Sequence, residues 1–139
     1  MYNKMLIAVD GSEHSFRAAD EAVKIASLAK ECVIDIVLVA EFSKSKDEIL
    51  HSQGKEELEF SRQKILFPLE EKLKAEGLTY NITILHGEPG TTIIKHANEG
   101  HYDLAVVGSR GLNAFQEMVL GSVSHKLVKR VDCPVLIVK

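Results

Sequence analysis

Residues 5–12 read MLIAVDGS, which is an apolar run of five residues ended by a polar turn. A short apolar run bounded by a turn is typical of a strand that is buried on both faces of a parallel sheet. Ser12 is a good N-cap residue, because its hydroxyl can accept one of the free amides in the first turn of a helix. A helix over 13–30 is then predicted by apolar residues at steps of three and four, namely Phe16, Ala19, Val23 and Ala26.

The same alternation continues to the C-terminus. Apolar and β-branched runs predict further strands at 33–40, 78–86, 103–107 and 135–138, and helices are predicted at 55–76, 89–100 and 122–130. Strands that alternate with helices form a parallel sheet with helices on both faces, so we predict an α/β fold with an open five-stranded sheet in three layers. The polar residues 41–54 predict a long loop.

The overall composition excludes several classes of protein. A length of 139 residues fits one domain, 1–139, and a net charge of −3 argues against a broad nucleic-acid surface. The sequence contains neither an apolar run of about 18 residues, as a membrane span needs, nor the pattern of a signal peptide. Cys32 and Cys133 form no CxxC motif, which favours two reduced thiols. We therefore expect a cytoplasmic protein that binds neither a membrane nor nucleic acid.

The strongest motif lies between the strand at 103–107 and the helix at 122–130. It reads Gly108-Ser109-Arg110-Gly111, then nine residues, then Gly121-Ser122-Val123-Ser124. Glycines let the backbone approach an anion closely, the free amides of a helix N-terminus favour phosphate, and Arg110 could pair with a phosphate oxygen. Chance gives this spacing in roughly 0.3% of chains of this composition. The alternative is a plain connection that uses its glycines for turns.

Asp10 follows the first strand and precedes a helix. In parallel sheets ligands bind outside the carboxyl ends of the strands, where Asp10, Ala40, His86 and Gly108 are predicted to lie. Asp10 could bind ribose hydroxyls or a phosphate-bound magnesium ion, and it is equally suited to an Asx turn. Neither GxGxxG after the first strand nor GxxxxGK[ST] occurs, so the familiar dinucleotide and Walker-type sites are absent from the sequence.

The remaining polar residues predict no catalytic residue and no metal site formed by the protein itself. His14 and His125 fall in the first turns of two predicted helices, where each is either a phosphate contact or a polar surface residue. His51, His96 and His101 show no partner pattern, and no nucleophile has a base at a recognisable spacing.

The last strand is short and apolar, with Val135, Leu136, Ile137 and Val138. An apolar strand at a sheet edge needs cover, which a two-fold homodimer paired through this strand would supply. The alternative is a strand that is internal or already covered.

Four segments together resemble the universal stress protein family over essentially the whole chain, and in particular its nucleotide-binding branch. They are Val9-Asp10-Gly11-Ser12, Gly87-Glu88-Pro89, the glycine motif above, and Cys133-Pro134-Val135-Leu136-Ile137-Val138. The resemblance implies a Rossmann-like sheet of order 3-2-1-4-5, of the adenine nucleotide alpha hydrolase-like kind. It also implies a homodimer paired through the last strand, and binding of ATP or AMP with Mg²⁺ held through the phosphates.

The resemblance also assigns roles to individual residues. The adenine and ribose would be lined by Ala8, Val9 and Asp10, with Ala40 (or Val39, if the strand shifts by one residue) facing adenine. Val107 and Gly108 would flank the ribose, and Ser109 and Arg110 would lie in the phosphate loop. The phosphates would be held by Gly111, Gly121, Ser122, Val123 and Ser124. Three functions stay open: a nucleotide-binding regulator in a stress response, a slow ATPase or nucleotidyl-transfer enzyme on the same site, and a ligand-free interaction dimer.

Overall fold

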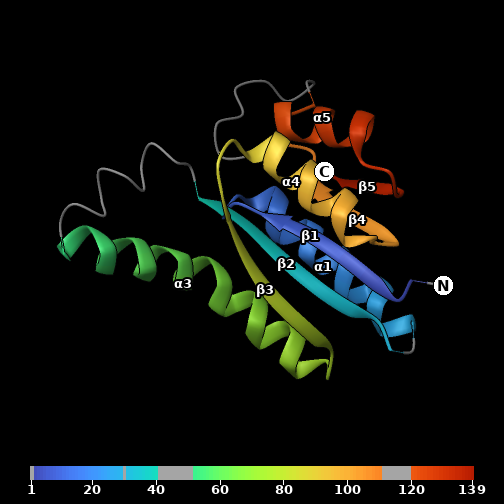
Figure 1. The fold of residues 1–139 in the computed structure, drawn as a ribbon. Coiled ribbons are helices and arrows are strands. Elements are labelled where there is room, and N and C mark those ends of the chain that lie inside the picture. Colours follow the sequence, from blue (N-terminus) through green and yellow to red (C-terminus); the bar gives the residue numbers. More distant parts are fainter. Residues whose placement is uncertain (1, 30, 41–51, 111–119) are drawn as a thin grey trace.

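The computed structural model describes residues 2–29, 31–40, 52–110 and 120–139. Strands and helices alternate throughout these ranges (Figure 1). In chain order they are β1 (Lys4–Val9), α1 (Glu13–Leu28), β2 (Val33–Ala40), α3 (Ser52–Ala75), β3 (Thr79–His86), α4 (Pro89–Gly100), β4 (Leu104–Gly108), α5 (Ser122–Arg130) and β5 (Val135–Val138).

The five strands form one parallel sheet in the order β3-β2-β1-β4-β5, which confirms the expected order. The central strand is β1, in which Met5 lies opposite Ile34 of β2 and Leu104 of β4. The chain leaves β1 towards β2 on one side and returns to β4 on the other. The strand order therefore reverses between β1 and β4, and in such sheets ligands usually bind outside the carboxyl ends of the strands at this point.

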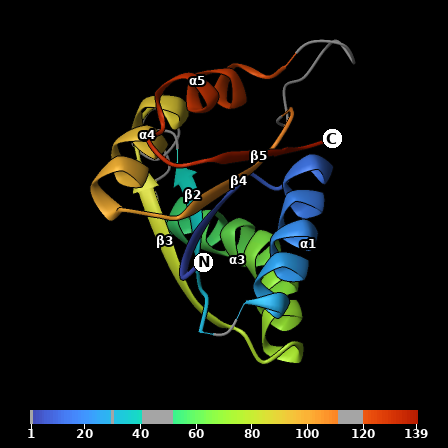
Figure 2. The same ribbon diagram turned by 90° about the vertical axis from the view of Figure 1, so that its right-hand side faces the viewer.

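Helices cover both faces of the sheet, with α1 and α3 on one face and α4 and α5 on the other (Figure 2). Side chains of a strand point alternately to the two faces, so Ile7 packs under α1 while Leu6 packs under α4 and α5. This alternation explains the continuous apolar runs in the sequence. Among the described residues, none of the helices combines the length and apolarity that crossing a membrane requires.

One boundary differs from the prediction. Residues 52–54, expected to end the long loop, form the first turn of α3, and residues 41–51 of that loop lie outside the described part of the chain. A polar composition does not distinguish a loop from an exposed helical turn, because neither buries apolar surface.

Candidate functional site

The carboxyl ends of β1 and β4 lie side by side at the centre of the sheet. Ala8 pairs with Val107 in register, so Asp10 and Gly108 follow at the same edge. Val9 pairs with Leu38, and Ala40 therefore lies two residues further along β2, towards the same edge. The predicted site residues of β1, β2 and β4 therefore lie together where the carboxyl ends of these strands meet.

Asp10 begins the turn that leads from β1 into α1. Its Oδ1 accepts the Ser12 amide at 2.9 Å, and Gly11 between them has a φ of +87°. Ser12 then caps α1, because its Oγ accepts the Ser15 amide at 3.2 Å. The Asx turn considered from the sequence is therefore present, and it holds the Asp10 carboxylate at the end of the strand.

Gly108 allows the first turn of α1 to pack directly on the end of β4. A Cβ at this position would lie 2.8 Å from both the carbonyl carbon and the Cβ of His14, and 2.9 Å from the carbonyl oxygen of His14. Because two of these three atoms belong to backbone, a side chain here would have to move the helix. Glycine at 108 therefore fixes where His14 lies relative to the site.

Two hydrogen bonds join the halves of the glycine motif. The Gly121 amide donates to the Ser109 carbonyl at 2.7 Å, and the buried Ser124 hydroxyl donates to the Gly108 carbonyl at 2.6 Å. The Ser109 amide donates in turn to the Val138 carbonyl of β5 at 2.8 Å. Residues 108–109 and 121–124 are thus held together as one frame, in which the Ser124 hydroxyl connects the two halves.

The N-terminus of α5 differs from those of its neighbours. The Ser12 side chain caps α1 and the Glu88 side chain caps α4. The N-cap residue of α5 is Gly121, and among the described residues no side chain caps this helix. The first amides of a helix have no intrahelical partner, and the helix dipole adds partial positive charge beside them. This end of α5 therefore offers donors for an anion.

Charged side chains surround this edge of the sheet. Arg110 Nη2 lies 3.1 Å from His14 Nε2, and burial together with the nearby Arg110 and Arg17 lowers the pKa of His14. At the start of α4, the hydroxyl and amide of Thr91 hold the pKa of Glu88 at about 2, and Lys126 Nζ of α5 lies 3.4 Å from Glu88 Oε1. Among the described residues, no cluster of three or more His, Cys, Asp or Glu side chains could hold a metal ion.

The predicted site residues differ in how far the structure exposes them to solvent. Gly111 alone of them lies outside the described residues. Ala8, Val9 and Val107 are buried within the sheet, whereas Ser122 at the start of α5 is exposed. The remaining residues are partly or fully buried at the edge: Asp10, Ala40, Gly108, Ser109, Arg110, Gly121, Val123 and Ser124.

Comparison with known proteins identifies the family. The family model described as the universal stress protein family matches residues 1–139. The universal stress protein YxiE of Bacillus subtilis (strain 168) is 40% identical over 155 aligned residues, which cover 100% of both chains. The chain belongs to the universal stress protein family.

Solved structures of similar proteins agree with this assignment. The hypothetical protein MJ0577 superposes with a TM-score of 0.87 at 27% identity, covering 100% of this chain and 96% of that one. A universal stress protein crystallised in complex with cAMP has a TM-score of 0.71 at 27% identity, and covers 99% of this chain and 97% of its own.

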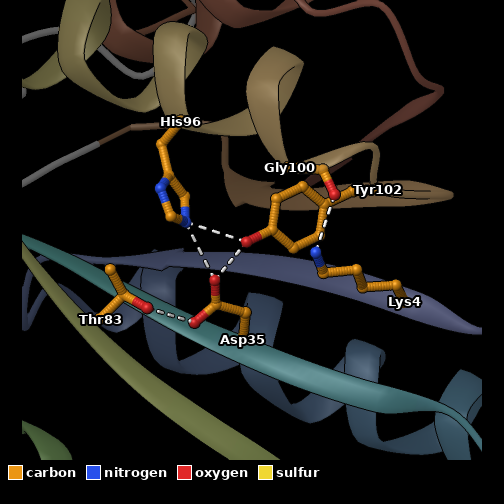
Figure 3. Close-up of polar contacts among 6 residues, drawn as sticks. All are labelled: Lys4, Asp35, Thr83, His96, Gly100 and Tyr102. Atoms are coloured by element: carbon orange, nitrogen blue, oxygen red, sulfur yellow. Dashed lines mark hydrogen bonds and ion pairs between the residues drawn. The ribbon is translucent and has the colours of Figure 1, made fainter.

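This universal stress protein also contains a buried polar cluster that the sequence analysis missed (Figure 3). Asp35 of β2 is only 6% exposed; its Oδ1 accepts the Thr83 hydroxyl at 2.7 Å, and its Oδ2 accepts the Tyr102 hydroxyl. His96 Nε2 of α4 lies 3.0 Å from the same Oδ2 and 2.9 Å from the Tyr102 oxygen. His96, for which the sequence shows no partner pattern, therefore has two partners in the fold, Asp35 and Tyr102.

The cluster lies away from the candidate site, since Asp35 is the third residue of β2 and the site lies at the other end of this strand. Lys4 completes it, with its Nζ donating to the Gly100 carbonyl at 2.7 Å and lying 4.5 Å from the centre of the Tyr102 ring. Burial and the neighbouring Asp35 raise the pKa of Tyr102, so the hydroxyl stays protonated and donates. A carboxylate inside the apolar run 33–40 was the one signal available in the sequence, because a buried charge requires partners.

Proposed function

We propose that this universal stress protein binds an adenine nucleotide, ATP or AMP, across the carboxyl ends of β1 and β4. In this proposal residues 1–139 act as a single domain, a small cytoplasmic regulator of a stress response. The observation that carries the proposal is the frame in which Gly121 and Ser124 are hydrogen-bonded to Ser109 and Gly108. That frame ends on a helix N-terminus without a side-chain cap among the described residues. The relative crystallised with cAMP supports an adenine nucleotide as the ligand class.

The residues present fit a phosphate chain. The amides of Ser122, Val123 and Ser124 would donate to phosphate oxygens at the start of α5, and Gly111 and Gly121 would allow the phosphate chain to approach the backbone. Arg110 would add a charge-assisted hydrogen bond. Ser109, which directly follows Gly108, would lie in the same phosphate loop.

The nucleoside would lie over the neighbouring strand ends. Asp10, held by its Asx turn, would accept hydrogen bonds from the ribose hydroxyls, and Val107 and Gly108 would flank the sugar. Ala8 and Val9 are buried, so their contribution would come from the backbone at the strand end. Ala40 would face adenine. Mg²⁺, where present, would be carried by the phosphates and would neutralise part of their charge.

We favour a regulatory role over catalysis because the sequence shows no nucleophile with a base at a recognisable spacing. Asp10 follows β1 at the same end of the sheet, and one of its carboxylate oxygens already accepts the Ser12 amide. Slow ATP hydrolysis or nucleotidyl transfer on the same site is the alternative. Regulation would require a nucleotide that binds two conformations of the protein with different affinities.

A homodimer paired through β5 forms part of the proposal. β5 lies at the end of the strand order, and all four of its residues, Val135, Leu136, Ile137 and Val138, are only partly buried. A short apolar edge strand of this kind is a ready template for a second copy of itself. A ligand-free interaction dimer would use the same edge and leave the glycine frame without a role.

The nucleotide content of the freshly purified protein tests the proposal. The protein would be denatured and the supernatant separated by anion-exchange chromatography, with Gly121→Val as the site variant. The matched control is Gly77→Asn, at the end of α3, where φ is +67° and asparagine is tolerated. We expect near-stoichiometric ATP or AMP in the wild type and the control and none in Gly121→Val. A protein that is empty and does not bind added millimolar ATP would overturn the proposal, and a falling ATP-to-ADP ratio over time would favour the enzyme.

A further inference from the structure

His14 and Arg110 meet beside the candidate phosphate site, although they lie 96 positions apart in the sequence. The imidazole comes from the first turn of α1, whose position Ser12 fixes by capping the helix. The guanidinium follows β4, two residues after Gly108, against which the His14 backbone packs. The pair is therefore held by the fold on both sides, at the edge where the nucleotide is proposed to bind.

The contact specifies the protonation state of His14. A guanidinium has five N–H donors, no acceptor, and does not lose its charge in proteins. Arg110 Nη2 therefore donates to His14 Nε2, which must carry a lone pair, and the imidazole is neutral with its proton on Nδ1. Protonation of Nε2 would turn this hydrogen bond into a repulsion between two cations.

The surrounding groups favour the neutral imidazole in the absence of a ligand. Burial lowers the pKa of His14, Arg110 and Arg17 lower it further, and the carboxylates of Glu13 and Asp10 oppose them without reversing the effect. The N-terminal pole of α1 also disfavours a cation in its first turn. A phosphate group beside Arg110 would reverse this balance, because it brings negative charge to the same place.

We propose that His14 is a phosphate-responsive positioning residue. Without nucleotide it holds the Arg110 side chain by accepting its N–H; with nucleotide it takes up a proton, releases Arg110 to the phosphates and faces them as a second cation. The proton comes from solvent and bonds to Nε2. This inference rests on the proposed nucleotide site, and it adds that the site responds to the charge of the phosphate chain.

The proposal determines how affinity depends on pH. A group whose pKa is higher in the complex than in the free protein strengthens binding fully below its free pKa. The gain is lost as pH rises through the pKa of the complex. Each unit by which the phosphates raise the pKa of His14 corresponds to about a tenfold gain in affinity at low pH. Adenosine, which has no phosphate, should gain nothing.

Isothermal titration calorimetry of the full chain measures the proton directly. ATP, AMP and adenosine would be titrated at about pH 6 and about pH 8, on either side of the ordinary histidine pKa, in buffers that differ in ionisation enthalpy. The test variant is His14→Gln, whose amide oxygen can still accept from Arg110 but cannot take up the proton. The matched control is His101→Asn, an exposed residue after α4 with a φ of 52°, which asparagine tolerates.

We expect ATP and AMP to cause more proton uptake in the wild type and in His101→Asn than in His14→Gln, by up to one proton per site, and adenosine to show no difference. Subtracting the variant removes the titration of the phosphates themselves. A second measurement needs no variant: the NMR titration of the His14 imidazole should move to higher pH when ATP is bound. Equal proton uptake by the wild type and His14→Gln, or a His14 titration unchanged by bound ATP, would overturn the inference and leave nucleotide binding intact. Failure of the wild type to bind ATP at either pH would overturn the proposed function, and this inference with it.

Discussion

Removing one hydroxyl from the buried polar cluster tests whether Asp35 is held as a charged group inside the fold. In Tyr102→Phe the ring stays in place, 7% exposed and packed in the core between the sheet and α4. The variant keeps the apolar contacts of the ring and removes the hydroxyl, which donates to Asp35 Oδ2 and lies 2.9 Å from His96 Nε2. Thr83 and His96 remain beside the carboxylate, as Figure 3 shows.

The size of the effect follows from the charge on the acceptor. A hydrogen bond to a charged group contributes about 1.5–3 kcal/mol, and a buried acceptor that loses a donor bears that loss in full. We therefore expect Tyr102→Phe to lower the free energy of unfolding by about 2 kcal/mol. For a domain of this size that lowers the melting temperature by roughly 6–10 °C.

The assay is urea unfolding followed by circular dichroism, with Tyr80→Phe as the matched control. The Tyr80 hydroxyl, on the outer strand β3, donates to Glu70 Oε1 at 3.2 Å, and its loss should change stability far less than the loss of the Tyr102 hydroxyl. The denaturant slope should be the same in both variants and the wild type. Equal stability of the two variants would refute the reasoning, because Asp35 would then be neutral or solvated by other means.

Three further predictions concern the frame and its surroundings. Ser124→Ala removes the buried hydroxyl that donates to the Gly108 carbonyl, so we expect a loss of about 1–3 kcal/mol in urea unfolding together with weaker nucleotide retention. Glu88 has its pKa lowered to about 2, so its stabilisation is present above its ordinary pKa and is lost as pH falls from about 4.5 to about 2. Its side chain is about half exposed, so this stabilisation amounts to well under 1 kcal/mol. As pH falls from about 4.5 to about 2, the melting temperature of Glu88→Gln should therefore fall slightly less than that of the wild type, as thermal unfolding at a series of pH values would show. The carbonyls of Pro134 and Val138 accept the amides of Ala105 and Ser109, so the amide of Ile137, which alternates with these groups along β5, points away from β4 to the outer edge. Ile137→Pro should therefore give a folded monomer by light scattering, and a persistent dimer would place the interface elsewhere.

The elements of this fold could be predicted from the sequence because their signals are local. A strand such as 5–9 is covered on both faces and is therefore apolar throughout, and it ends where the first polar residue, Asp10, begins a turn. The helix over 122–130 was predicted with its observed bounds, since Gly121 precedes it and basic residues end it. The glycine motif could be located for the same reason, because it lies between a predicted strand and a predicted helix, and the structure ends β4 at Gly108 and begins α5 at Ser122.

What could not be predicted depends on contacts between distant segments. The Ser124 hydroxyl is a plausible phosphate donor in the sequence, and only the structure shows that it donates to Gly108, which lies 16 positions earlier. His96 shows no partner in the sequence because its partner Asp35 lies 61 positions away on another element. Spacing rules describe one helix or one strand, and neither contact lies within a single element.

The buried cluster and the candidate site are connected through α4, although they lie at opposite ends of it. At its N-terminus, Glu88 caps the helix and reaches Lys126 of α5, the helix whose first amides are proposed to bind phosphate. Towards its C-terminus, His96 holds the helix to Asp35 of the sheet. Since α4 packs along α5, the Asp35 cluster fixes the platform against which the phosphate helix is positioned. In Tyr102→Phe, His96 still joins α4 to Asp35, so the variant should lower stability while the folded protein retains its nucleotide, whereas Gly121→Val should lose nucleotide and keep its stability. If Tyr102→Phe instead weakens binding in protein that is fully folded, then α4 moves with the ligand, and the cluster takes part in regulation as well as in folding.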